Sequence, residues 1–345
     1  MGIIISIIKI VIVFGLIVVM HEGAHFLVAK KNNIYVREFA IGFGPKIFSK
    51  TKNGTVYSIR AIPFGGFNDL ADNPKSEKET DEIADHQYFR DASVRVRLAI
   101  VLAGAIANIL FAMLLFFTIN LFYENKSLVV DFVGTEFNAY GIILPNDELK
   151  KVDDKKLHVR SDLDNYFFTE QPEQVKVTLI RDGKEMVIDV PTSKIELGNS
   201  VRYLLGVNMK PVEKTLKNQF YHSFWNTINF VIKTFNGYRL LFTGGLSIDS
   251  FSGPIGIGET IASSRGIYEI LHYLAAISIS LGIVNLIPIP GLDGGKTVLL
   301  LYKLITRKKV NEDVEAILTI IGVFILLMLA LYVTQKDIFR FFIKQ

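Results

Sequence analysis

Residues 3–25 read IIISIIKIVIVFGLIVVMHEGAH, an apolar run that ends in two histidines and a glutamate. Only three residues interrupt the run before the first histidine: Ser6, Lys9 and Gly15. A helix needs about 20 mostly apolar residues to cross the hydrocarbon core of a bilayer. Because no small-residue cleavage site follows, the pattern predicts a retained membrane-spanning helix and not a cleaved signal peptide.

The composition indicates several membrane spans. Hydrophobic residues make up 50% of the 345 residues, and the mean hydropathy is +0.34, which is more apolar than a typical soluble protein. The net charge of +4 is modest, and no basic block is interleaved with aromatic residues, which argues against a nucleic-acid partner. Because the chain contains no cysteine, any metal site must use His, Asp or Glu.

Four segments are predicted to cross the membrane. They are Ile3–Ala29, Leu98–Phe122, Ile270–Ile289 and Ala316–Val333. Lys and Arg gather in the loop between the first two spans and in the loop between the last two, which places both loops in the cytoplasm. Both chain ends and the long segment 124–219 are then extracytoplasmic. A fifth stretch, Phe220–Phe242, mixes aromatic with charged residues and is predicted to be an amphipathic helix at the membrane interface.

The segments between the spans contain β-hairpin signals. In residues 31–67, Asn53-Gly54 separates two alternating runs, and Asp182-Gly183 does the same inside residues 127–211. Such pairs favour two-residue turns between antiparallel strands. We therefore expect a hairpin after the first span and a small β or α/β domain at 127–211. The charge-dense segment 68–92 reads either as a loop over the cytoplasmic face or as a solvated linker.

His21-Glu22-Gly23-Ala24-His25 carries the chemistry of the first span. On a helix, the two histidines share one face and can reach one ion, and Glu22 beside them can deprotonate a bound water. A catalytic zinc uses three protein ligands and one open position. A packed histidine pair is the alternative, but ionisable groups at membrane depth usually mark function.

The third ligand is expected in NLIPIPGLDGG, residues 285–295. The prolines there break the helix, and the three glycines are expected to leave the backbone loose around Asp293. Irregular backbone at membrane depth is tolerated where it lines a protein or water cavity. Asp293 is therefore the best candidate ligand, and a turn carboxylate facing the cytosol is the alternative.

These motifs resemble the site-2 protease family of intramembrane zinc metalloproteases, and within it the bacterial RseP/RasP type with one PDZ domain. Asn285-x-x-Pro288-x-Pro290-x-x-Asp293-Gly294 and the His21–His25 motif carry the resemblance. Four shorter stretches are similar to family motifs in the same order: Gly42-Phe43-Gly44-Pro45, Pro63-Phe64-Gly65-Gly66-Phe67, Gly104-Ala105-Ile106-Ala107-Asn108 and Ser252-Gly253-Pro254-Ile255-Gly256-Ile257. Ala105 stands where the family has proline.

The resemblance implies a polytopic α-helical membrane protein with four transmembrane helices, a membrane-associated β-hairpin and a PDZ-like extracytoplasmic domain. Its segments would be the first span 1–30, the hairpin and loop 31–97, the second span 98–123, the PDZ-like domain 124–212, the interfacial helix and linker 213–267, the third span 268–310, and the fourth span with the tail 311–345. The location would be the bacterial inner membrane, with the active site toward the cytoplasm.

The resemblance also implies roles for single residues. His21, His25 and Asp293 would bind one Zn²⁺ per chain, with Glu22 as the general base. Substrate-binding positions would be Asn285, Asn108, Gly42, Phe43 and Gly44. The substrate would be the transmembrane segment of a single-span protein, such as a trimmed anti-sigma factor or a remnant signal peptide, prepared by an upstream site-1-type protease. A membrane metal transporter and a non-catalytic PDZ scaffold are the alternative functions.

Overall fold

The computed structural model describes residues 2–72, 83–197, 200–244, 252–308 and 311–343. Four described helices are long and apolar enough to cross a membrane: Ile4–Lys31, Val94–Phe122, Ile267–Leu286 and Asp313–Phe339. They coincide with the four predicted spans. Of the charge-dense segment 68–92, residues 73–82 lie outside the described residues. The chain forms two compact units, one of Met1–Ala112 with Ser247–Gln345 and the other of Met113–Leu246.

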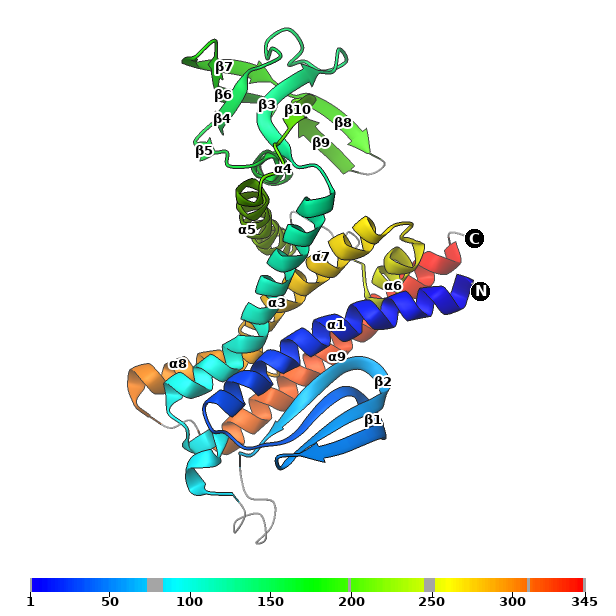
Figure 1. Ribbon diagram of the computed structural model, residues 1–345, viewed down its shortest axis with the longest axis vertical. Helices are drawn as coiled ribbons and strands as arrows, with labels where there is room; N and C mark the ends of the chain where they lie inside the picture. The colour runs from blue at the N-terminus through cyan, green and yellow to red at the C-terminus, as the bar shows by residue number, and fades with distance from the viewer. Residues whose placement is uncertain (1, 73–82, 198–199, 245–251, 309–310, 344–345) are drawn as a thin grey trace. The chain divides into compact units, whose positions relative to one another are not determined.

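Helices and one hairpin build the first unit (Figure 1). The helices are α1 (Gly2–Lys31), the first part of α3 (Val94–Phe122), α6 (Pro254–Ser263), α7 (Ile267–Leu286), α8 (Asp293–Thr306) and α9 (Glu312–Ile343), with the short 3₁₀ helices η1 (Asp85–Gln87) and η2 (Phe89–Asp91). α7 ends just before Pro288 and Pro290, since proline has no amide hydrogen to continue a helix.

The glycines after these prolines do not loosen the backbone as expected. Gly294 and Gly295 lie buried in the first turn of α8, which begins at Asp293. A Cβ on Gly294 would stand 2.2 Å from the Ile287 carbonyl oxygen, and one on Gly295 would stand 2.5 Å from that of Ile289. The two glycines therefore allow α8 to start against the extended segment before it, which fixes the position of Asp293.

The predicted hairpin is present and folds back on itself. β1 (Val36–Lys52) and β2 (Thr55–Leu70) meet at Asn53 and Gly54, whose φ angles are 51° and 75°, as a two-residue hairpin turn requires. Residues 38–41 have register partners in both 56–59 and 66–69. Since a strand has only two edges, residues 38–41 lie between the two ends of β2. Residues 66–69 are thus an outer strand, and β2 packs on α1.

A partly buried carboxylate holds the folded-back hairpin together. Glu38 accepts hydrogen bonds from Ser58 Oγ at 2.5 Å and Arg60 Nη2 at 2.8 Å, and Lys46 Nζ lies 3.1 Å away. Burial raises the pKa of the Glu38 carboxyl, but these three donors outweigh it and hold that pKa below its ordinary value. These contacts join β1 to β2. They also link Glu38 to Lys46 across the part of β1 in which the pairing register shifts.

The short helix α6 has a charged side chain from another helix at each end. Asp337 of α9, although buried, accepts hydrogen bonds from the Gly253 and Gly256 amides at 3.2 and 2.9 Å. Lys9 of α1 donates to the Ser264 carbonyl at 2.7 Å, just past the last turn of α6. Both contacts complement the helix dipole, which is positive at the N-terminus and negative at the C-terminus.

The second unit contains a small antiparallel β domain and the helix α5 (Leu216–Phe242). Its sheet has the order β10 (Val207–Pro211), β3 (Lys126–Val133), β4 (Glu148–Val152), β6 (Gln174–Arg181) and β7 (Lys184–Pro191), with β5 (Lys155–Lys156) beside β4. The helix α4 (Arg160–Thr169) and the hairpin of β8 (Ser193–Leu197) and β9 (Ser200–Leu204) complete it. The predicted turn at Asp182-Gly183 joins β6 to β7, and buried side chains such as Leu149 and Leu179 form the core.

Candidate metal centre

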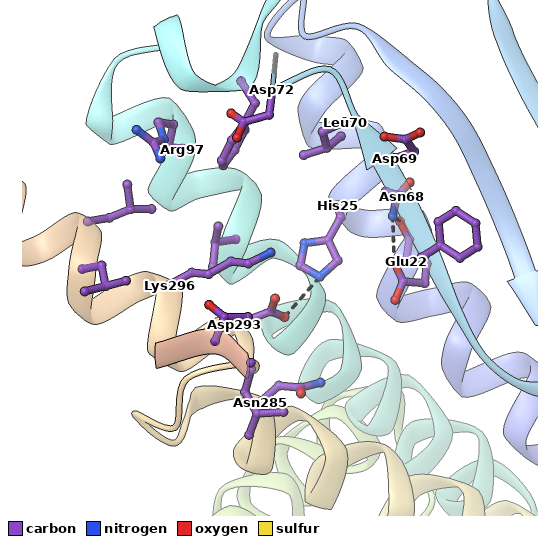
Figure 2. Close-up of a pocket in the computed structure, with 18 of the residues that line it drawn as sticks. Glu22, His25, Asn68, Asp69, Leu70, Asp72, Arg97, Asn285, Asp293 and Lys296 are labelled. Carbon is purple, nitrogen blue, oxygen red and sulfur yellow. Dashed lines mark hydrogen bonds and ion pairs between the residues drawn. The ribbon is translucent and has the colours of Figure 1, made fainter. Parts of the chain in front are cut away.

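Three side chains meet where the C-terminal half of α1 faces the start of α8. His21 Nε2 and His25 Nε2 are 3.2 Å apart, and each lies 3.3 Å from Asp293 Oδ2. Among the described residues, this is the group of His, Cys, Asp and Glu that could hold a metal ion. Both imidazoles are buried, and Figure 2 shows Asp293 directed at His25. The structure therefore brings together the three residues that the sequence named as ligands.

The spacing of these atoms fits a tetrahedral zinc site. With zinc-to-ligand bonds of about 2.0–2.1 Å, tetrahedral ligand atoms lie about 3.3–3.4 Å from each other. The observed separations of 3.2 and 3.3 Å agree with that value. In addition, Asp293 Oδ2 is buried without a hydrogen-bond partner, an arrangement that a cation would satisfy. The residues present thus fit a zinc ion.

Contacts from α3 orient both imidazoles. His25 Nδ1 lies 2.7 Å from the Ile100 carbonyl oxygen, so Nδ1 carries the hydrogen and Nε2 presents its lone pair to the cluster. Asn108, fully buried, places its amide nitrogen 3.3 Å from His21 Nδ1, and its Oδ1 has no hydrogen-bond partner. With the amide turned so that Oδ1 faces His21, Oδ1 accepts the Nδ1 hydrogen of that imidazole.

Gly104 of α3 lies against both histidines. A Cβ built there would stand 2.3 Å from His25 Nε2 and 2.6 Å from His21 Cε1. Glycine is therefore the residue that lets α3 approach the imidazole face of α1 closely enough for the contacts of Ile100 and Asn108. The sequence singled out Gly104 through the motif resemblance alone, and the structure supplies the steric reason.

Glu22 projects from the turn of α1 that carries His21 and His25, and a residue of the hairpin holds its side chain (Figure 2). Asn68 of β2 donates from Nδ2 to Glu22 Oε2 at 2.8 Å and to the Glu22 main-chain oxygen at 2.9 Å. Sequence reasoning named Glu22 but not Asn68. The partners are 46 positions apart, and a lone asparagine in a strand gives no local signal of such a contact.

A cavity of about 1390 Å³ opens at the cluster. His21, Glu22, His25 and Asp293 line it together with residues of the outer strand 66–69. Of the five positions predicted to bind substrate, Asn285 and Phe43 line the cavity, and the Asn285 amide lies 3.3 Å from His21 Nε2. Gly42 and Gly44 flank Phe43 in β1 with φ angles of 88° and 82°. Asn108 lies behind His21, away from the cavity lining.

The family comparison covers almost the whole chain. The model of peptidase family M50 matches residues 9–329. The chain belongs to peptidase family M50. A relative in Clostridium acetobutylicum with a provisional zinc metalloprotease name is 32% identical over 95% of this chain and 96% of its own length. The zinc metalloprotease RasP of Geobacillus kaustophilus is 29% identical over 98% of this chain and 99% of its own length.

Membership of family M50 confirms the predicted enzyme class. It also gives the ligand cluster a chemical context, since the matched region contains His21, Glu22, His25 and Asp293.

Proposed function

We propose that this family M50 member is an intramembrane zinc endopeptidase that cleaves a transmembrane segment of a single-span membrane protein. The observation that carries the proposal is the convergence of His21, His25 and Asp293 at zinc-ligand spacing, with Glu22 on the same cavity. The ligand-bearing helix α1 is itself long and apolar enough to span a bilayer, so the reacting bond would be met at membrane depth.

Glu22 is proposed as the general base. A zinc ion held by His21, His25 and Asp293 would supply Lewis acidity and a water of lowered pKa. Glu22 accepts a proton from the attacking water and returns it to the leaving amine as the peptide bond breaks. Ile100 and Asn108 keep the two imidazoles turned so that both Nε2 atoms face the cavity.

The outer strand 66–69 is the proposed docking edge for an unwound substrate. A helical substrate segment has its amides bonded internally, so it must unwind before hydrolysis, and pairing with a strand edge would satisfy the freed groups without regard to side chains. Residues 66–69 line the cavity beside Glu22, which supports this placement. Asn285 and the Gly42-Phe43-Gly44 segment would hold the substrate at the same cavity, whereas the position of Asn108 supports a role in orienting His21.

We also propose that the β domain of the second unit is the PDZ-like module, placed outside the bacterial inner membrane. Its support is an independent core and one helix over an antiparallel sheet whose edge strand β10 pairs only with β3 among the described strands. The domain would reject substrates with bulky outer parts, so that an upstream protease must trim them first. A reporter series with outer domains of increasing size tests this, with loss of discrimination expected on deletion of residues 127–211.

The Glu22→Gln variant tests the catalytic proposal. We expect it to bind about one zinc per chain, by elemental analysis, yet to leave a tagged single-span signal-peptide reporter uncut. Glu269→Gln is the matched control and should cut normally, because it alters a partly exposed glutamate outside the cavity lining that accepts from the Arg265 amide. Full activity of Glu22→Gln would refute the proposed mechanism. Substrates trapped by this variant can be identified by mass spectrometry.

Sidedness is directly measurable because the chain contains no cysteine. Single cysteines at Lys184 in the β domain and at Lys308 after α8 would be labelled with a membrane-impermeant maleimide on intact cells. We expect labelling of Lys184→Cys from outside and of Lys308→Cys only after lysis. The opposite pattern would reverse the proposed orientation.

A further inference from the structure

Asn68 contacts the proposed base with both hydrogens of its side-chain amide. The Nδ2 group donates to Glu22 Oε2 at 2.8 Å and to the Glu22 carbonyl oxygen at 2.9 Å, as the dashed line at Asn68 in Figure 2 marks for this pair. The two acceptors fix which way the amide is turned, since the opposite orientation would place Oδ1 against both oxygens. Oδ1 is buried without a hydrogen-bond partner, so the contacts with Glu22 orient the side chain.

This contact depends on how closely β2 lies on α1. Gly66 is two positions before Asn68 and therefore on the same face of the strand. A Cβ on Gly66 would stand 2.9 Å from Val18 Cγ1 and 3.1 Å from Glu22 Cγ. The outer strand thus rests directly on the turn of α1 that carries Glu22, and Asn68 is the polar side chain with which it holds the carboxylate.

We propose that Asn68 is a positioning residue that keeps the Glu22 carboxylate in one orientation beside the ligand cluster. The inference rests on the proposed role of Glu22 as base. A glutamate side chain loses rotamer freedom when it is fixed, and a bond made in advance removes that cost from the reaction. The same bond ties the base to the hairpin, so alignment of Glu22 requires the outer strand to be seated on α1. Loss of Asn68 should therefore lower turnover and leave substrate affinity and zinc content unchanged.

The test compares three variants of the full-length chain, purified in detergent and loaded with zinc. Asn68→Leu removes the donor at similar volume, and Asn68→Gln keeps an amide on a longer side chain. Asn32→Leu is the matched control, because the Asn32 amide also donates to a main-chain oxygen of α1, that of Val28, at 2.8 Å. The probe is a synthetic single-span peptide with a fluorophore and a quencher on either side of the cleaved bond.

For Asn68→Leu we expect kcat to fall roughly 10- to 100-fold, as is usual when a residue that supports a metal site is lost, with KM and zinc per chain near wild type. Asn68→Gln should recover part of kcat, and Asn32→Leu should match wild type. Calorimetry with a peptide hydroxamate adds a readout other than activity, because its hydroxyl must hydrogen-bond to an aligned Glu22. Its affinity should fall in Asn68→Leu and not in Asn32→Leu.

Wild-type kcat in Asn68→Leu would overturn the inference, and so would a loss of activity that follows a loss of zinc or of folded protein. Turnover by Glu22→Gln would instead overturn the proposed function itself. If Glu22→Gln is inactive and Asn68→Leu is fully active, the positioning role of Asn68 is rejected while the proposed function stands.

Discussion

Replacing Gly104 with alanine should destroy the metal site although Gly104 binds no metal. The added Cβ would stand 2.3 Å from His25 Nε2, whereas ordinary van der Waals contact begins at 3.4 Å. Either the His25 imidazole or one of the helices α1 and α3 must therefore move by about 1 Å. This shift is a large fraction of the 3.2–3.3 Å that separates the three ligand atoms. Misplacement on this scale costs about 100-fold in rate, and we expect zinc affinity to fall with it.

Gly23→Ala is the control for this substitution. Gly23 lies inside the histidine motif, yet a Cβ there has nothing within 4 Å. In a helix, alanine is more favourable than glycine by about 0.5–1 kcal/mol. The control variant should therefore be as active as the wild type and slightly more stable. The assay is zinc per chain by elemental analysis beside peptide cleavage. Normal zinc content and cleavage in Gly104→Ala would refute the steric reasoning.

Four further outcomes follow from the site and its supports. Asp293→Asn should lower the zinc content measured after dialysis, because it removes the charged ligand, and chelator treatment of the wild type should abolish a cleavage that added zinc restores. Asp337→Ala should lower the free energy of unfolding by about 1.5–3 kcal/mol, the value of hydrogen bonds to a charged group, measured by chemical denaturation in detergent; an unchanged stability would contradict the capping of α6. Glu38→Gln should destabilise the hairpin by about 1–2 kcal/mol at neutral pH. The folded-state pKa of Glu38 lies below its ordinary value of 4.5. The difference in the free energy of unfolding between wild type and Glu38→Gln should therefore be complete above pH 4.5 and should shrink as the pH falls toward the folded-state pKa. A difference that stays constant with pH would show that the charge of Glu38 does not contribute.

Local patterns predicted those parts of the fold that short stretches determine. The turn at Asn53-Gly54, the turn at Asp182-Gly183 and the four apolar helices each depend on neighbouring residues, and the structure has them all. The helix α8 was not predicted. Its glycines indicated loose backbone when viewed along the chain, whereas their contacts with the Ile287 and Ile289 carbonyl oxygens show close packing.

The ligand residues were accessible from sequence because metal binding restricts residue type and spacing. The roles of the residues that support them were not accessible, since Ile100 acts through its main chain, Gly104 through the absence of a side chain, and Asn68 through a contact between a strand and a helix. None of these roles leaves a pattern in one stretch of sequence. They become visible only when α3 and β2 are placed against α1.

The contacts of Asp337 and Lys9 with the two ends of α6 have a consequence for the stability of the apolar bundle. An ionised side chain in an apolar helix is costly, and a helix of ten residues is marginal by itself. Here the two costs offset each other. The N-terminus of α6, with a partial positive charge of about half a unit, faces Asp337, and the C-terminal end, with a similar negative charge, faces Lys9. The short helix acts as a polarised spacer between α1 and α9. If it unwound, two charges would lose their partners together, so its melting should be coupled to separation of the helices it joins.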